Sequence, residues 1–234
     1  MPTRVPIVVF AGQSNANNTG SIAAIFDRVA AINGLMVQAA VNGSPLASTK
    51  TGPDWSAGRT TGELLQNLFD LIDPLLNPNS PSYVPGAYLD AVIWSQGGAD
   101  VFSKAAALAY QSNLTDLIRN LQTRYGTHDF IISGLADSSL TGRALTGQMA
   151  LNWEMVQSAQ QAVAALPNVT LIDPDRVAAL SGVAAAQMYS ADFIHYRNGF
   201  GAQLGAALAN AVPQNPHAAN SGQTAITYRT GTIG

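Results

Sequence analysis

Short apolar runs alternate along this chain with longer segments in which apolar residues recur every three or four positions. The short runs are nearly continuous, as in Leu89, Ala91, Val92, Ile93 and Trp94, which is typical of strands covered on both faces. The alternation predicts a parallel five-stranded sheet between two layers of helices, a three-layer α/β/α sandwich. The predicted strands cover residues 5–11, 35–41, 88–95, 129–135 and 168–173.

The longer segments predict amphipathic helices whose apolar stripes belong to the core. Thr60 and Glu63 have the spacing of a capping box at the start of one of them. A last helix is expected at about 199–211. The stripes are Leu64, Leu65, Leu68, Phe69 and Ile72; Leu114, Leu117, Ile118, Leu121 and Tyr125; and Phe200, Leu204 and Leu208.

The chain has 234 residues, which is enough for one domain with a substantial core. We expect that domain to occupy residues 1–212. From 213 to 234 the helical period is lost and Asn, Gly, Thr and Ser dominate. This tail is either a linker or an added edge strand.

Composition excludes several classes of function. With 11 Lys and Arg against 14 Asp and Glu, the chain has no basic field for a nucleic acid. The absence of cysteine excludes disulfides, thiolate metal sites and a cysteine nucleophile, and no other spacing indicates a metal site. No apolar run is long enough to cross a membrane, and the N-terminal run is expected to be a strand rather than a signal peptide. A cytoplasmic, a particle-associated and a signal-independent exported protein all remain open, as does the oligomeric state.

In a parallel sheet, ligands bind beyond the carboxyl ends of the strands. Four polar, glycine-containing blocks follow predicted strands and are expected at that one rim. They are Gly12-Gln13-Ser14-Asn15, Val41-Asn42-Gly43-Ser44-Pro45-Leu46, Trp94-Ser95-Gln96-Gly97-Gly98-Ala99-Asp100 and Asp192-Phe193-Ile194-His195.

These blocks contain the parts of a serine hydrolase. A serine hydroxyl needs a base, usually histidine, which needs a carboxylate to orient it and to stabilise the imidazolium. Ser14, His195 and Asp192 supply that set, and the spacing of three between Asp192 and His195 allows the two side chains to meet across one turn. We therefore predict that these three residues are catalytic.

Acyl transfer also needs donors for the oxyanion of the tetrahedral intermediate. The candidates are the backbone N–H groups of Ser14 and Gly43 and the side-chain amide of Gln96, and glycine at 43 and 97 allows close approach of the backbone to substrate. Taken singly, each residue has a structural interpretation as well: Gln96 could tie two loops together, and Asp100 could cap a helix. Their combination favours an active site.

Other titratable residues compete poorly for a catalytic role. His128 and His217 are expected to be solvated bystanders, the first at the opposite rim of the sheet and the second in the tail. Asp173 and Asp175 flank a proline, and their pattern is ordinary turn and helix-start chemistry.

The four blocks, in this order, resemble those of the SGNH hydrolases, and within that superfamily the sialate O-acetylesterase and carbohydrate esterase branch. The resemblance spans most of residues 5–211. It implies a flavodoxin-like fold, no cofactor, an acetylated glycan as substrate, and removal of acetyl groups from sugar hydroxyls through a serine acyl-enzyme. The chain departs from the branch at Gly98, where a glutamate is usual.

Two alternatives remain open on the sequence. The same scaffold serves short-chain lipid esterases and thioesterases, which would prefer acyl groups longer than acetyl. A glycan-binding or particle-associated module with weak catalysis is the second alternative, motivated by Gly98, by the low charged fraction and by the composition of the tail.

Overall fold

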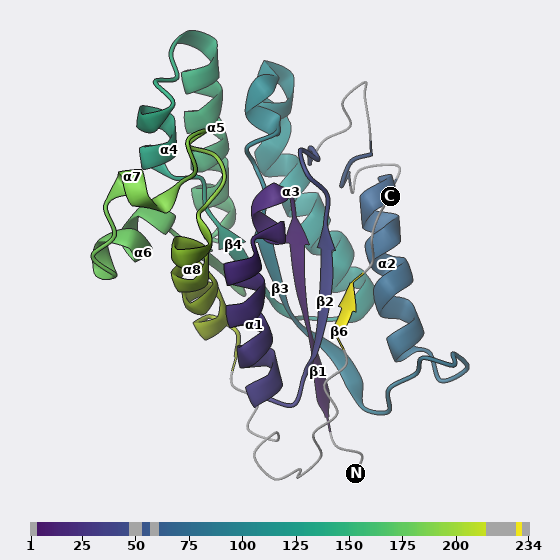
Figure 1. Cartoon of the computed structure of the whole chain (residues 1–234). Coiled ribbons are helices and arrows are strands. Elements are labelled where there is room, and N and C mark those ends of the chain that lie inside the picture. Colours follow the sequence, from purple (N-terminus) through teal and green to yellow (C-terminus); the bar gives the residue numbers. More distant parts are fainter. Residues whose placement is uncertain (1–3, 47–52, 57–60, 214–227, 231–234) are drawn as a thin grey trace.

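A parallel sheet lies between two helical layers, which confirms the predicted α/β/α sandwich (Figure 1). The computed structural model describes residues 4–46, 53–56, 61–213 and 228–230. The strand order is β5-β4-β3-β1-β2-β6, and every neighbouring pair is parallel. The strands are β1 (Val5–Gly12), β2 (Leu35–Ala40), β3 (Ala87–Ser95), β4 (Asp129–Ser133), β5 (Val169–Ile172) and β6 (Tyr228–Thr230).

The first five strands begin and end within two residues of the predicted boundaries. The sixth comes from the tail, where Tyr228–Thr230 pairs with Met36–Gln38 of β2 at the edge of the sheet. Of the two interpretations of the tail, this pairing favours an added edge strand. The flanking residues 214–227 and 231–234 lie outside the described part of the chain.

The helices divide between the two faces of the sheet (Figure 1). Alternate residues of β1 show the division, because Ile7 and Val9 join the core beneath one layer and Val8 and Phe10 join the core beneath the other. The first layer contains α2 (Glu63–Leu76), α3 (Lys104–Tyr125) and α5 (Gly147–Val163). The second contains α1 (Thr19–Ala31), α6 (Pro174–Leu180), α7 (Ala185–Met188) and α8 (Asn198–Asn210). Three short elements lie beyond strand ends: η1 (Ser14–Asn17), η2 (Asp100–Phe102) and α4 (Asp137–Gly142).

The predicted capping box at the start of α2 is wrong. The helix begins at Glu63 with Gly62 as its N-cap, whereas a capping box would need Thr60 in that position, and Thr60 lies outside the described residues. A backbone group caps the first turn instead, because the Asp54 carbonyl accepts the Leu64 N–H at 3.0 Å. The segment that folds over the helix start replaces the side-chain cap.

Helices α1 and α8 pack with their backbones in contact, although about 180 residues separate them. The Ser21 hydroxyl donates to the Gly201 carbonyl at 2.8 Å, and a Cβ added at Gly205 would lie 2.6 Å from the Ser21 Cα. Such proximity requires glycine, because any larger residue would push the helices apart. Since α1 follows the Ser14 segment and α8 follows His195, this contact draws those two segments to one rim.

We expect Gly205→Ala to destabilise the fold, although alanine is the better helix former by about 1 kcal/mol. Overpacking against α1 should cost about 1–3 kcal/mol and outweigh that gain. Gly199→Ala is the matched control, because nothing lies within 4 Å of a Cβ at that position of the same helix. Thermal unfolding should show a lower Tm for Gly205→Ala and an unchanged or higher one for Gly199→Ala. Equal shifts would contradict the packing argument.

Candidate active site

Three of the predicted blocks follow the carboxyl ends of β1, β2 and β3, and the Asp192–His195 turn lies beside them, so that all four line one pocket. The pocket has a volume of about 500 Å³, within the range of small-molecule sites. Ser14 and His195 both line it. The lining residues are Gln13, Ser14, Asn42, Gly43, Gly98, Ala99, Phe102, Arg143, Trp153, Ile194 and His195.

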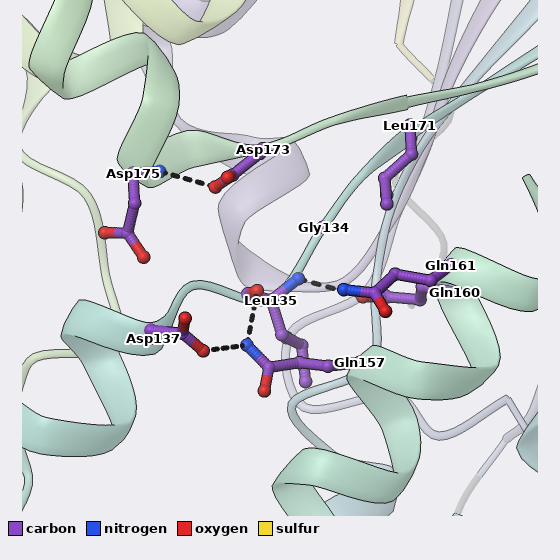
Figure 2. Close-up of a pocket in the computed structure, with 9 residues that line it drawn as sticks. All are labelled: Gly134, Leu135, Asp137, Gln157, Gln160, Gln161, Leu171, Asp173 and Asp175. Carbon is purple, nitrogen blue, oxygen red and sulfur yellow. Dashed lines mark hydrogen bonds between the residues drawn. The ribbon is translucent and has the colours of Figure 1, made fainter.

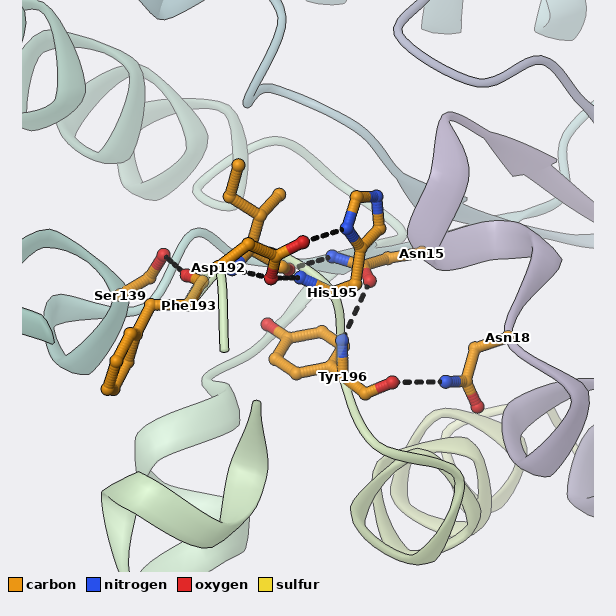
Figure 3. Close-up of polar contacts among 8 residues, drawn as sticks. Asn15, Asn18, Ser139, Asp192, Phe193, His195 and Tyr196 are labelled. Atoms are coloured by element: carbon orange, nitrogen blue, oxygen red, sulfur yellow. Dashed lines mark hydrogen bonds and ion pairs between the residues drawn. The ribbon is translucent and has the colours of Figure 1, made fainter. Parts of the chain in front are cut away.

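Asp192 and His195 form a hydrogen-bonded pair in a tight turn (Figure 3). The Nδ1 atom of His195 lies 2.6 Å from Oδ2 of Asp192. The other carboxylate oxygen accepts the backbone N–H groups of Ile194 at 2.9 Å and His195 at 3.0 Å. Phe193 turns the chain with a φ of 53°, a conformation that is strained for a bulky residue. With Nδ1 engaged by Asp192, Nε2 is left to exchange a proton with another group.

Asp192 is ionised throughout the neutral and mildly acidic range. Partial burial raises the pKa of its carboxyl group, but the hydrogen bonds from the His195 ring and from the N–H groups of Ile194 and His195 outweigh this effect and lower the pKa to about 2. A carboxylate that stays charged fixes the orientation of the imidazole and stabilises its protonated form.

The side chain of Asn15 connects the serine segment to the histidine segment (Figure 3). Its amide nitrogen donates to the Ile194 carbonyl at 2.9 Å, and its oxygen accepts the Tyr196 N–H at 3.2 Å. One side chain therefore holds the backbone on both sides of His195. Because Asn15 follows Ser14 directly, the two predicted catalytic residues are placed by the same contact.

A second amide extends this connection. Asn18 donates to the Tyr196 carbonyl at 2.7 Å, while its oxygen caps α1 through the Ser21 N–H. Neither Asn15 nor Asn18 has a role that could be predicted from the sequence pattern. The one available signal was the density of amides directly after the serine, in Asn15, Asn17 and Asn18.

Ser14 and His195 line the same pocket without a direct hydrogen bond between them. Catalytic hydrogen bonds of this kind are often long before substrate binds. Ser14 opens η1 directly after β1, where the Gln13 N–H still donates to the Ser95 carbonyl of the neighbouring strand at 2.9 Å. The sheet thus fixes the backbone immediately before the hydroxyl.

Two backbone donors are available beside the hydroxyl. Gly43, with a φ of 69°, is exposed in the loop after β2 and lines the pocket. Neither the Gly43 N–H nor the Ser14 N–H has a hydrogen-bond partner within the described part of the chain. That these two N–H groups bind an oxyanion stays a prediction.

Gln96 does not reach the pocket, and this corrects the prediction that its amide binds the oxyanion. Both N–H bonds of its side chain are used, one to the Ser44 carbonyl at 3.1 Å and one to the Asp100 carboxylate at 2.5 Å. Its oxygen accepts the Tyr110 hydroxyl at 3.0 Å. Burial of Gln96 leaves no donor for a substrate, so its structural interpretation as a tie between loops is the correct one.

Gly97 is also placed away from the pocket. A Cβ at this position would lie 3.1 Å from side-chain atoms of Val156 and Gln160 on α5. The residue therefore makes room for a helix rather than for substrate, which corrects the prediction for Gly97.

Asp100 is fully buried and does not cap a helix. Its carboxylate accepts the Leu46 N–H at 2.9 Å as well as the Gln96 amide. Leu46 ends the block that carries Gly43, so the buried carboxylate ties the loop after β2 to the end of β3. A buried charge is costly unless it is hydrogen-bonded, and this network supplies the bonds.

Gly98 lies against the end of the Gln13 side chain. A Cβ at position 98 would lie 2.9 Å from Nε2 of Gln13. The Gln13 oxygen accepts the Ala99 N–H at 3.1 Å. A larger residue at 98 would therefore require the end of the Gln13 side chain to shift.

His128 is buried at the opposite rim, which confirms its distance from the site but corrects the expectation that it is solvated. Its Nδ1 lies 2.8 Å from the Gly126 carbonyl oxygen. Burial lowers the pKa of the imidazole. His217 lies outside the described residues.

A second hollow of about 180 Å³ lies beyond β4 and β5, with Asp137, Asp173 and Asp175 around it (Figure 2). Each carboxylate has a protein partner: the Gln157 amide at 2.8 Å, the Asp175 N–H at 2.9 Å and the Ser138 N–H at 3.1 Å, respectively. Asp173 is the N-cap of α6, as its turn pattern indicated. No cluster of three or more metal-ligating side chains occurs among the described residues, so we interpret this hollow as loop structure.

Within the described residues, no helix combines the length and apolar character needed to cross a bilayer.

Several solved structures share the fold. A protein from Arabidopsis thaliana is 17% identical with a TM-score of 0.62, covering 89% of this chain and 98% of that one. A lipase/acylhydrolase from Enterococcus faecalis is 16% identical with a TM-score of 0.56, covering 90% and 98%. A carbohydrate acetylesterase family member from Sinorhizobium meliloti is 11% identical with a TM-score of 0.55, covering 89% and 97%.

At the sequence level, no curated protein matches the chain. A family model does: the one described as carbohydrate esterase, sialic acid-specific acetylesterase, matches residues 33–214. That range includes Gly43, Asp192 and His195 and begins after Ser14. Since it covers most of the chain, the protein belongs to this family of carbohydrate esterases, and its broad class is that of an esterase.

Proposed function

We propose that the protein is a serine esterase that removes O-acetyl groups from a carbohydrate. Ser14 is the nucleophile, His195 the general base and acid, and Asp192 the residue that orients His195. The N–H groups of Ser14 and Gly43 bind the oxyanion. The observation that carries the proposal is the shared pocket: Ser14 and His195 both line it, and His195 is held by Asp192 through Nδ1, which leaves Nε2 for the serine proton.

The reaction proceeds in two acyl transfers. The Ser14 Oγ attacks the acetyl carbonyl carbon while Nε2 of His195 accepts the hydroxyl proton, and the resulting oxyanion is stabilised by the two N–H groups. The C–O bond to the sugar then breaks, and His195 gives its proton to the departing sugar oxygen. Water, activated by the same histidine, attacks the acetyl-enzyme and releases acetate.

The surroundings of the pocket support a carbohydrate as the alcohol part of the ester. Gln13, Asn42 and Arg143 provide polar groups along the lining. Phe102 also lines the pocket and exposes 62% of its surface. An exposed aromatic ring beside polar groups suits a sugar, which has an apolar ring face and hydroxyl groups at its edge.

The serine assignment is tested by Ser14→Ala, which should lower kcat for acetate release from 4-nitrophenyl acetate and from acetylated xylan by at least about a thousandfold. The change removes only the attacking oxygen, so the Tm should stay within a few degrees. Ser112→Ala is the matched control, because Ser112 is exposed on α3 and its loss should leave turnover unchanged. Full activity in Ser14→Ala would remove this residue from the mechanism.

The pH dependence should report one protonation between pH 8 and 4. Since the pKa of Asp192 is about 2, its carboxylate stays charged in this range and adds no step to the pH profile. We expect log(kcat/KM) to fall with a limiting slope of one as the pH decreases. A pKa lowered by folding also means that Asp192 contributes stability above about pH 4 and loses it only as the pH falls toward 2. The loss of activity should therefore be reversed on return to pH 8, and a limiting slope of two would contradict the assignment.

Asn15→Ala should lower kcat by about 10- to 100-fold with a smaller change in KM, because misplacement of a catalytic group by about 1 Å is that costly. Asn15→Asp keeps the acceptor for the Tyr196 N–H but loses the donor to the Ile194 carbonyl, so its kcat should be intermediate. The rate at which Ser14 reacts with a serine-directed phosphonate should follow the same order. Unchanged kcat in both variants would show that Asn15 does not position His195.

A further inference from the structure

Phe102 exposes an aromatic ring beside Ser14 and His195. It lines their pocket, and 62% of its surface is exposed. Single exposed apolar residues are common on protein surfaces, so the exposure alone indicates no function. Among the large hydrophobic residues that the described part of the chain exposes, however, Phe102 is the one that lines this pocket. The others are Tyr83, Leu108, Leu151 and Leu180.

The backbone that carries the Phe102 ring is held on both sides. Val101 is fully buried, and its carbonyl accepts the side-chain N–H of Asn152 on α5 at 2.8 Å. On the other side, the Ser103 N–H donates to the Asp100 carbonyl at 3.2 Å, and the Ser103 hydroxyl caps α3. A ligand therefore does not have to order the segment that presents the ring, which lowers the entropic cost of binding.

The Gln13 side chain adds an unused hydrogen-bond donor to the same pocket. Gln13 lines the pocket and is only 7% exposed. Its oxygen accepts the Ala99 N–H at 3.1 Å, which fixes the orientation of the amide. Its Nε2 atom donates to no residue within the described ranges, and Gly98, next to it, has no side chain that could cover it. Because buried polar groups are normally hydrogen-bonded, this amide indicates an acceptor supplied from the pocket.

The strand order separates these two groups from the predicted oxyanion donors. Strand β1 lies between β2 and β3. In the proposed reaction the ester carbonyl oxygen lies at the N–H groups of Ser14 and Gly43, at the ends of β1 and β2. The side of the pocket toward β3, with Phe102 and the Gln13 amide, is left for the rest of the ester. An acetyl methyl group is small and offers no acceptor to an amide, whereas a sugar offers hydroxyl and ring oxygens.

We propose that Phe102 and Gln13 form a subsite for the sugar ring on the alcohol part of the ester. The Phe102 ring stacks on a C–H face of the pyranose, and the Gln13 amide donates to one of its oxygens. The face of an aromatic ring is electron-rich and attracts polarised C–H groups. Neither side chain is charged, so the subsite recognises the ring itself and selects sugar esters over esters of acyclic alcohols. This inference rests on the esterase function proposed above.

The test compares two uncharged acetyl esters whose alcohol parts both carry hydroxyl groups. Mono-acetylated methyl β-xylopyranoside has a pyranose ring, and glycerol monoacetate has none. Each kcat/KM for acetate release is divided by the rate constant for alkaline hydrolysis of the same ester, which removes the difference in intrinsic reactivity. For the wild type, the normalised value should be at least about tenfold higher for the xyloside, because only the xyloside buries a ring face against Phe102.

Phe102→Ala should reduce this preference to about twofold or less. The loss should appear as a rise of about 5- to 50-fold in KM for the xyloside with a smaller change in kcat, because stacking acts equally on bound substrate and transition state. Phe102→Tyr keeps the ring and should retain the preference.

Gln13→Met tests the amide, because methionine has a similar length and no N–H donor. The KM for the xyloside should rise by about 3- to 10-fold, as expected for the loss of one neutral hydrogen bond. A merely structural role beside Ser14 would instead lower kcat for both esters.

Leu108→Ala is the matched control. Leu108 is exposed to the same extent as Phe102 but lies on α3 outside the pocket lining, so its loss should leave kcat and KM for both esters unchanged. A measurement on the wild type alone does not depend on how the variants fold. Unacetylated methyl β-xylopyranoside should inhibit hydrolysis of glycerol monoacetate competitively at concentrations at which glycerol does not.

Equal normalised kcat/KM for the two esters in the wild type would overturn the inference, as would a preference for the xyloside that survives in Phe102→Ala. If the wild type hydrolyses both esters equally well, in reactions lost in Ser14→Ala, the subsite fails while the proposed function stands. If it releases acetate from neither ester nor from 4-nitrophenyl acetate, both fail.

Discussion

The site depends on the contact that holds the segment after β1 to the turn before α8. Ser14 and His195 lie 181 positions apart in the sequence, and no strand carries both. The Asn15 amide joins the two segments by bonding on either side of His195, and Asn18 adds a third bond to Tyr196. Hydrogen bonds of this type contribute only about 1 kcal/mol each. Their value lies in geometry, because they set the position of His195 relative to Ser14.

Those amides can act because the helices behind them are already in place. The backbone contact between α1 and α8 at Ser21, Gly201 and Gly205 brings the start of one helix beside the start of the other. Apolar burial on the second face of the sheet stabilises this arrangement. The Asp192–His195 turn is thus an extension of a packed pair of helices, although both of its polar side chains are exposed.

The site combines a buried polar network with an exposed hydrogen-bonded pair, Asp192 and His195. Asp100, Gln96 and Tyr110 are enclosed and fully occupied in holding the loop that contains Gly43 to the end of β3. Asp192 and His195 remain accessible and do not form part of that core. This division explains why Gln96, which lies in a block next to the pocket, does not serve as a donor to substrate. In the low dielectric of the interior its amide stabilises Asp100, and an unpaired carboxylate there would be costly.

Periodicity and local spacing were enough to predict the sandwich, the five main strands and the Asp192–His195 pair. Continuous apolar runs are required wherever a sheet is covered on both faces, and a spacing of three brings two side chains together in any single turn. Gln96, Gly97 and His128 were misjudged because their roles depend on neighbours that are distant in the sequence: Ser44 and Tyr110 for the glutamine, α5 for the glycine, and the burial of the imidazole near Gly126. The sequence alone therefore determined which chemical groups lie at the rim, since strand direction and block order are local properties. Only the tertiary structure decided which of those groups are free for a substrate and that Arg143 joins them, because hydrogen-bond occupancy and burial are set by contacts between distant segments.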